Sequence, residues 1–184
     1  ICTRHDPEGR PSVFDRLPKI RQGRWVSVGR LDLNTAGLLL FTNDGALAHR
    51  LMHPSAEIPR EYWVRVAGDV SESTLEALRH GLELEDGFAR FDDIVPLQAL
   101  HEDDSQYNRY FSVTLKEGRN REVRRLWEAV GCRVSRLKRI RFGNLYLPKE
   151  LAQGRYRLLT PGETNALLEP LRQKKGPART PGPR

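Results

Sequence analysis

The order of short apolar segments most constrains the fold of this chain. Strands are predicted where apolar residues alternate or run together, at 25–28, 38–42, 61–66, 94–100, 107–115, 133–142 and 155–159. Helical spacing occurs at 46–52, 71–80, 120–131 and 161–171. Because the strands are not joined by regular helical crossovers, the pattern favours an α+β fold with a mixed, largely antiparallel sheet and flanking helices over a doubly wound parallel sheet.

The clearest amphipathic pattern is the predicted helix at 120–131, which Asn120 is expected to cap. Its apolar residues follow the i, i+3, i+4, i+7 spacing of one helix face: Val123, Leu126, Trp127 and Val130. Arg124 lies about 100° from Val123 on the helical wheel, at the border of this face. Arg124 is therefore expected to reach sideways into a pocket. The strand after this helix is expected to contain a bulge or bend around residues 136–138, where its alternation fails.

Positive charge is concentrated in two segments of the 184-residue chain, whose net charge is +7. Residues 116–141 hold ten Lys and Arg against three Glu, and residues 172–184 hold five basic residues and no acidic one. The remainder carries a net charge of −5. The first segment, here called the basic band, is typical of a surface that binds a nucleic-acid backbone, although a solvated helix face and strand would give the same count. The second segment is expected to be a flexible basic tail.

Several classes of protein are disfavoured. The longest apolar run, at 36–41, is far shorter than the roughly 20 residues of a membrane span. The two cysteines, Cys2 and Cys132, suit a reducing cytoplasm and support neither a disulfide framework nor a metal site. His49 and His53 have the spacing of a zinc-protease pair, but Arg50 stands where the general base would be. We expect a cytoplasmic protein that has neither of these metal sites and contacts no membrane.

Asp32 lies in a tight turn between Gly29 and Gly37, beside a predicted buried strand. Glycines allow the backbone to approach a ligand closely, so Asp32 is a candidate nucleophile or base. An aspartate near Asn34 and Thr35 is also typical of a turn or helix cap, and spacing alone leaves both interpretations open. A buried aspartate that stays ionised needs a cation, and Arg124 is a candidate partner.

Three ordered motifs resemble those of the pseudouridine synthases, in the branch that modifies ribosomal RNA. They are residues 29–39 (GRLDLNTAGLL), 118–126 (GRNREVRRL) and 137–143 (LKRIRFG). The resemblance spans about residues 1–170. It implies a mixed, largely antiparallel sheet with a central active-site cleft, and isomerisation of a uridine in 23S ribosomal RNA to pseudouridine without a cofactor. It also implies a catalytic domain at 1–171, from which the small preceding RNA-binding domain of relatives is missing.

The resemblance assigns roles by position. Asp32 matches the catalytic aspartate, Tyr62 the active-site tyrosine, Arg124 the basic partner of the aspartate, and Leu137 the apolar residue that packs on the target base. The expected RNA contacts are Arg30, Arg119, Asn120, Arg121, Arg125, Lys138 and Arg139. The expected partner is a stem-loop of large-subunit ribosomal RNA, bound by a monomer.

Two alternatives remain open on sequence alone. The first is a noncatalytic ribosomal-RNA-binding or ribosome-assembly protein that uses the same basic band. The second is a glycoside or nucleoside hydrolase, which normally needs two carboxylates across the bond to be broken. No second carboxylate stands out as a partner for Asp32 in the sequence.

Overall fold

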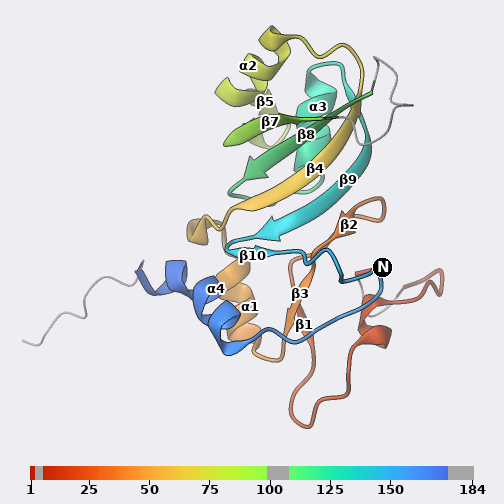
Figure 1. Cartoon of the computed structure of the whole chain (residues 1–184), viewed down its shortest axis with the longest axis vertical. Coiled ribbons are helices and arrows are strands. Elements are labelled where there is room, and N and C mark those ends of the chain that lie inside the picture. The colour runs from red at the N-terminus through yellow and green to blue at the C-terminus, as the bar shows by residue number, and fades with distance from the viewer. Residues whose placement is uncertain (3–5, 99–107, 174–184) are drawn as a thin grey trace, which may run out of the picture.

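The structure, a computed structural model, describes residues 1–2, 6–98 and 108–173. One part of the molecule is built on a six-stranded sheet, in the order β10–β9–β4–β8–β7, with β2 paired to β9 off this path (Figure 1). Every pairing in it is antiparallel except the parallel pairing of β2 with β9. The strands are β2 (Ala36–Gly37), β4 (Arg60–Ala67), β7 (Asp93–Leu97), β8 (Asn108–Leu115), β9 (Arg133–Phe142) and β10 (Leu145–Tyr146). The predicted mixed, largely antiparallel sheet is confirmed.

Two further strand pairs and four α-helices complete the described part of the fold. β1 (Val26–Val28) pairs antiparallel with β3 (Leu40–Thr42), and β5 (Leu82–Leu84) pairs with β6 (Gly87–Ala89). The helices are α1 (Gly45–Met52), α2 (Glu72–His80), α3 (Glu122–Ala129) and α4 (Pro161–Gln173), with short 3₁₀ turns at Val13–Arg16 and Pro54–Ala56. Figure 1 shows α2 and α3 with the six-stranded sheet, and α1 and α4 with β1 and β3 at the other end. The α+β class is therefore confirmed.

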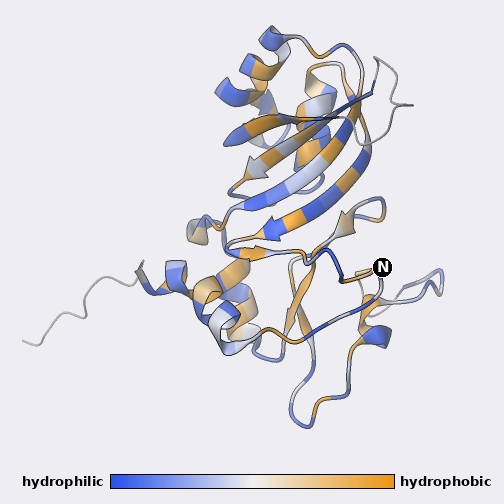
Figure 2. Ribbon diagram, viewed as in Figure 1, coloured by the Kyte–Doolittle hydropathy of each residue, from blue (hydrophilic) through white to orange (hydrophobic). Residues whose placement is uncertain are grey.

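A first hydrophobic core, here called the upper core, lies where α2 and α3 cover the sheet. Along β4, Tyr62, Val64 and Val66 are buried whereas Trp63 is exposed, as the predicted alternation requires. Figure 2 shows hydrophobic and hydrophilic residues following one another along β4 and β9. The apolar face of α3 packs Trp127 against Phe111 of β8, with ring centroids 5.1 Å apart. This packing fixes α3, and the loop before it, against the sheet.

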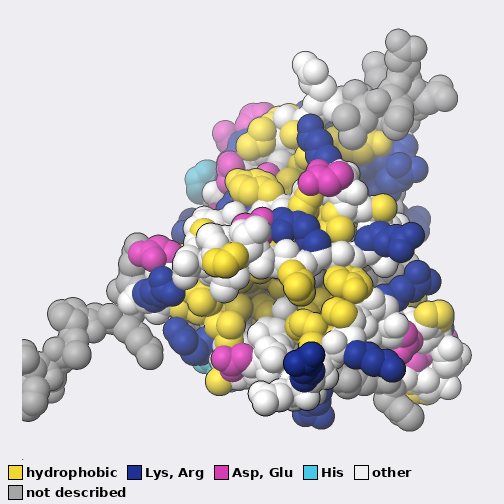
Figure 3. All heavy atoms as spheres, turned by 60° about the horizontal axis from the view of Figure 1, so that its bottom comes forward, with side chains coloured by type: hydrophobic (Ala, Val, Ile, Leu, Met, Phe, Trp, Pro, Cys, Tyr) yellow, Lys and Arg dark blue, Asp and Glu magenta, His cyan; other side chains and the backbone are white. Residues whose placement is uncertain are grey.

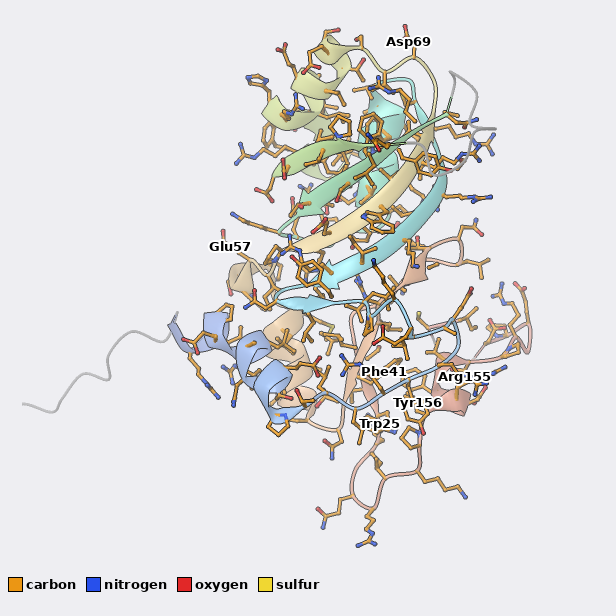
Figure 4. All side chains as sticks on the ribbon, viewed as in Figure 1. Trp25, Phe41, Glu57, Asp69, Arg155 and Tyr156 are labelled. Carbon is orange, nitrogen blue, oxygen red and sulfur yellow. The ribbon has the colours of Figure 1, made fainter. Side chains whose placement is uncertain are left out.

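A second hydrophobic core, here called the lower core, joins the remaining elements to the ends of the long strands. It contains Val28 of β1, Leu51 of α1 and Leu167 of α4, together with Phe142 at the end of β9. Figure 4 shows the labelled side chains of Trp25, Phe41 and Tyr156 in this part of the molecule. Since Leu137 of the same strand belongs to the upper core, β9 takes part in both cores. On the face in Figure 3, Lys and Arg side chains surround a hollowed area of hydrophobic side chains.

Some expected local features are wrong. Residues 155–159 form no strand, and Arg157 there pairs instead with Glu163 of α4 at 2.5 Å. Asn120 does not cap α3: Arg121 stands at the cap position in a left-handed conformation, without a side-chain cap.

Other boundaries are displaced or lie outside the description. The register shifts between β4 and β9 fall at Ser135 and Ile140, on either side of the expected bulge at 136–138. α4 continues to Gln173, so Arg172 is helical rather than the start of the tail. The rest of the tail, and the acidic segment 101–105 between the strands predicted at 94–100 and 107–115, lie outside the described residues.

Candidate active site

A pocket of about 460 Å³ lies where the sheet meets the β1–β2 connection and the loop before α3. It brings together Asp32, Tyr62 and Leu137, three of the four residues to which the sequence assigned a catalytic role. Five arginines also line it: Arg30, Arg60, Arg119, Arg121 and Arg139. Asp32, Glu117 and Glu122 supply its carboxyl groups. A small, half-apolar chamber with several guanidinium groups suits an uncharged ring attached to phosphates.

Asp32 is positioned through β9, although more than a hundred residues separate them in sequence. The turn that carries it is closed by the Thr35 N–H, which donates to the Asp32 carbonyl at 2.9 Å. The next two residues pair with β9, and the Leu38 N–H donates to the Arg139 carbonyl at 2.8 Å. Gly37 has a φ of +109°, and a Cβ there would lie 2.1 Å from the Arg139 carbonyl oxygen. Only glycine allows so close an approach of the two backbones.

Tyr62 and Leu137 reach the pocket from adjacent strands of the sheet. Tyr62 pairs with Arg139 in register, and Leu137 pairs with Val64. Both side chains are largely buried, at 9% and 7% exposure, on the face of the sheet that α3 covers. The side chains facing the pocket are therefore held by the upper core.

Arg124 was expected to reach into a pocket, but it is buried outside the set of residues that line this one, where it ties three segments together. Its guanidinium donates to the Val134 carbonyl at 3.0 Å and to the Asn34 carbonyl at 2.7 Å, linking α3 to β9 and to the Asp32 turn. Burial lowers the pKa of Arg124, and the negative charge of Asp32 acts to raise it. The described residues show no ion pair within 4 Å between Arg124 and Asp32, so the link between them runs through the Asn34 carbonyl of the Asp32 turn.

Arg60 is a buried pocket residue that the sequence did not single out. Its guanidinium donates to the Ile58 carbonyl at 2.8 Å and the Lys116 carbonyl at 3.1 Å, and stands 5.0 Å from the centre of the Phe142 ring. Burial lowers its pKa. The available signal was alternation, because Arg60 lies two residues before Tyr62 and therefore shares its face of β4.

Arg139, expected to contact RNA, is also buried, with an exposure of 4%. Its Nε donates to the Leu38 carbonyl at 2.8 Å, so it supports the β2–β9 junction from within the pocket wall. One of its terminal nitrogens has no hydrogen-bond partner among the described residues. The charge of Arg139 is thus enclosed in the pocket rather than spread on the surface.

Two other expected RNA contacts, Arg119 and Arg125, are occupied by acidic partners. Arg125 forms two hydrogen bonds to the Asp86 carboxylate, at 2.7 and 2.8 Å. Arg119 lies 2.7 Å from Glu117 and 3.3 Å from Asp86. These arginines lower the pKa of Asp86 to about 2, and the hydrogen bond from Arg125 makes the largest contribution. No local sequence pattern indicates this cluster, because Asp86 belongs to the turn of the unpredicted β5–β6 hairpin.

The other expected RNA contacts lie on the surface, unlike Arg119 and Arg125. Arg30, Asn120, Arg121 and Lys138 are exposed, and Arg121 lies 3.5 Å from Glu128.

Among residues 1–2, 6–98 and 108–173, no group of three His, Cys, Asp or Glu side chains could hold a metal ion. No helix within these ranges is long and apolar enough to cross a membrane.

Comparison with known proteins decides the family. The family model described as RNA pseudouridylate synthase matches residues 1–129, which contain the Asp32 turn, Tyr62 and the whole of α3. The chain belongs to the RNA pseudouridylate synthase family. The resemblance seen in the three motifs is thereby confirmed.

Individual members of the pseudouridylate synthase family match over nearly the whole chain. A Pseudomonas aeruginosa protein named ribosomal large subunit pseudouridine synthase B is 54% identical over 99% of this chain and 46% of its own length. A Salmonella typhimurium protein of the same name is 59% identical over 91% of this chain and 56% of its own length. The chain therefore spans about half the length of these relatives.

A solved structure agrees. One titled "Crystal structure of pseudouridylate synthase" superposes with a TM-score of 0.71 at 31% identity, covering 85% of this chain and 65% of that one. The fold described above is thus that of a pseudouridylate synthase.

Proposed function

We propose that this chain carries the catalytic centre of a cytoplasmic enzyme that isomerises a uridine of large-subunit (23S) ribosomal RNA to pseudouridine. The observation that carries the proposal is the placement of Asp32 in one pocket with Tyr62 and Leu137. The names of the relatives support the choice of RNA.

The reaction replaces the bond between C1′ and N1 of uridine by a bond between C1′ and C5. The uracil must be detached, rotated and rejoined without escaping, so the enzyme must hold a base that has left its stack. Asp32 starts the reaction, either as a nucleophile on the nucleotide or as the base that removes the 2′ proton. The pocket around it is small and partly apolar, which limits escape of the detached ring.

The neighbouring residues complete the site. Tyr62 stacks on the uracil, and its hydroxyl accepts the C5 proton at the end of the reaction. Leu137 packs on the other side of the base. Arg124 holds the Asp32 turn in place, because its guanidinium donates a hydrogen bond to the Asn34 carbonyl of that turn.

The ribosomal RNA stem-loop is bound by a monomer through exposed groups around the pocket. Arg30, Asn120, Arg121 and Lys138 are the exposed members of the expected set. Arg119 and Arg125 act differently from the expectation, since Asp86 and Glu117 already occupy them. Their role is to shape the loop that forms the pocket wall.

The test is tritium release from a 23S ribosomal RNA transcript labelled at uracil C5. Wild type should release tritium, and Asp32→Asn should be slower by at least about a thousandfold, as is usual when a catalytic group is removed. Asp69→Asn is the matched control, because Asp69 is exposed at the far end of the molecule (Figure 4).

The other outcomes separate the alternatives. Equal release by wild type and Asp32→Asn, or no release by either, contradicts the proposal and leaves a noncatalytic RNA-binding protein. Release of free uracil instead of tritiated water would indicate a hydrolase. RNA binding by Asp32→Asn, measured in parallel, shows that the variant is folded.

A further inference from the structure

A second hollow, of about 800 Å³, lies against β4 and β9. Trp63 and Arg65 of β4 line it, and they alternate with the buried Tyr62 and Val64. Its remaining walls come from β7, β8, β9 and residues 33–36, together with Gln98 and Gln153. We call it the Trp63 groove. It lies on the sheet face opposite to α3, so the candidate active site does not contain it.

The side chains of the Trp63 groove combine aromatic rings with positive charge. Trp63 is 42% exposed, and the guanidinium of Arg65 stands 6.0 Å from the centre of the Tyr110 ring. Arg136 and Lys138 of β9 add two more exposed cations. No Asp or Glu is among the described residues that line this groove. Aromatic faces stack on bases of any sequence, and cations beside them attract the phosphates.

The charge of the groove favours RNA over a protein partner as its occupant. A protein surface of mixed charge would bring acids and bases, whereas this groove offers cations and the amides of Asn34, Gln98 and Gln153. Amide side chains can pair with base edges. The Asp32 pocket differs, because Glu117 and Glu122 line it beside its arginines.

The Trp63 groove is continuous with the wall of the Asp32 pocket. Thr35 and Leu137 line both hollows, so residues 33–36 form the boundary between them. The same segment contains Asn34, whose carbonyl receives the hydrogen bond from Arg124. A ligand in the groove would therefore contact the segment that carries Asp32.

We propose that the Trp63 groove binds an unpaired nucleotide of the same RNA whose target uridine enters the Asp32 pocket. Its base stacks on Trp63, and its phosphate lies beside Arg136 and Lys138. This proposal rests on the proposed function, since it takes RNA as the substrate. Binding there fixes the RNA strand on both sides of residues 33–36.

The first test compares Trp63→Ala, Trp63→Phe and Tyr146→Ala. Trp63→Ala should weaken binding of the stem-loop RNA about tenfold, since stacking of one base contributes that much affinity. It should raise KM more than it lowers kcat, and Trp63→Phe should restore most of the binding. Tyr146→Ala is the control, because Tyr146 is an exposed ring beside Arg141 that lines neither hollow. Equal effects of Trp63→Ala and Tyr146→Ala would overturn the proposal.

The second test does not depend on how the alanine variant folds. The chain has three tryptophans, Trp25, Trp63 and Trp127, and Trp127 is fully buried. Oligouridine should quench the fluorescence of wild type and Trp25→Phe, but not that of Trp63→Phe. Unchanged quenching in Trp63→Phe would exclude stacking on Trp63. If the wild-type protein forms dimers and Trp63→Ala does not, the proposal is also overturned, because the groove would then bind a second copy of the chain.

These outcomes are separable from failure of the proposed function. If wild type releases no tritium but oligouridine is still bound at Trp63, RNA binding by the groove is supported and the isomerase activity is contradicted. If tritium release depends on Asp32 but no variant at Trp63 changes RNA binding, the isomerase activity is supported and RNA binding by the groove is contradicted.

Discussion

Glu122, at the first residue of α3, has a carboxyl group that is almost fully buried. The Arg119 backbone N–H donates to it at 3.0 Å, and its other oxygen has no hydrogen-bond partner among the described residues. Burial, with a smaller contribution from the neighbouring Glu117, raises the pKa of Glu122 to about 7. Near neutral pH, ionising this group therefore costs folding free energy.

Glu122→Gln should remove that cost. The unfolded chain releases the proton of Glu122 near its ordinary pKa of 4.5, whereas the folded protein keeps it up to about pH 7. The free energy of unfolding therefore falls as the pH rises between these values. We compare the free energy of unfolding of Glu122→Gln with that of wild type by urea unfolding. The difference in favour of the variant should increase by on the order of 2 kcal/mol from pH 5 to pH 8. The exposed Glu128→Gln on the same helix is the control, and an equal gain there would contradict this account.

Arg124→Lys should affect catalysis more than RNA binding. Lysine keeps the positive charge but cannot bridge the Val134 and Asn34 carbonyls with a planar fork. The Asp32 turn should then lose its tie to α3, and the single-turnover rate should fall by roughly tenfold or more. RNA affinity, measured by filter binding, should change much less. A larger loss in affinity than in rate would assign Arg124 to RNA contact.

At the level of elements, β2 is very short for its importance. Its two residues form the only parallel pairing among the described strands, and they bring the Asp32 turn to β9. The absence of a Cβ at Gly37 makes this pairing possible.

Gly37→Ala should separate β2 from β9 and move Asp32 out of the pocket. An added Cβ would meet the Arg139 backbone, and a backbone carbonyl cannot turn aside as a flexible side chain does. We expect a loss of several kcal/mol in unfolding free energy or of nearly all activity, measured by thermal unfolding and tritium release. Gly45→Ala in α1 is the control, because a Cβ there meets nothing within 4 Å. Similar losses in both variants would contradict the role given to Gly37.

The sequence predicted elements best where one local pattern determines them. Alternation placed β4 and the buried face of Tyr62, and helical spacing placed α2, α3 and Arg124. The strand expected at 155–159 failed because alternation cannot show whether a partner strand exists. The β5–β6 hairpin was missed because its strands are short and mix apolar with charged residues. Its contact between Asp86 and Arg125 depends on tertiary structure alone.

For the whole molecule, the basic band is less available to RNA than its composition indicates. Arg124 and Arg139 are buried, and four other band arginines form ion pairs with acidic residues: Arg119, Arg121, Arg125 and Arg141. The exposed cations of the band without an ion pair among the described residues are Lys116, Arg133, Arg136 and Lys138. The sequence could count the charges, but pairing between distant segments decides which of them face solvent.

RNA affinity should therefore depend on salt less steeply than ten cations would require. Each phosphate neutralised on single-stranded RNA contributes about 0.7 to the slope of log affinity against log salt. We expect a slope of about −3 to −4, measured by titration between 50 and 300 mM salt. A slope near −7 would show that RNA displaces the acidic partners of the paired arginines.

The participation of β9 in both cores has a consequence for dividing the protein. A fragment that ended after α3 would contain Asp32, Tyr62 and Arg124, and all of the sequence that matches the family model. It would lack the strand on which the Asp32 turn is seated and to which β4 is paired. Such a fragment would keep the catalytic side chains but could not bring them together until the missing C-terminal piece was supplied in trans.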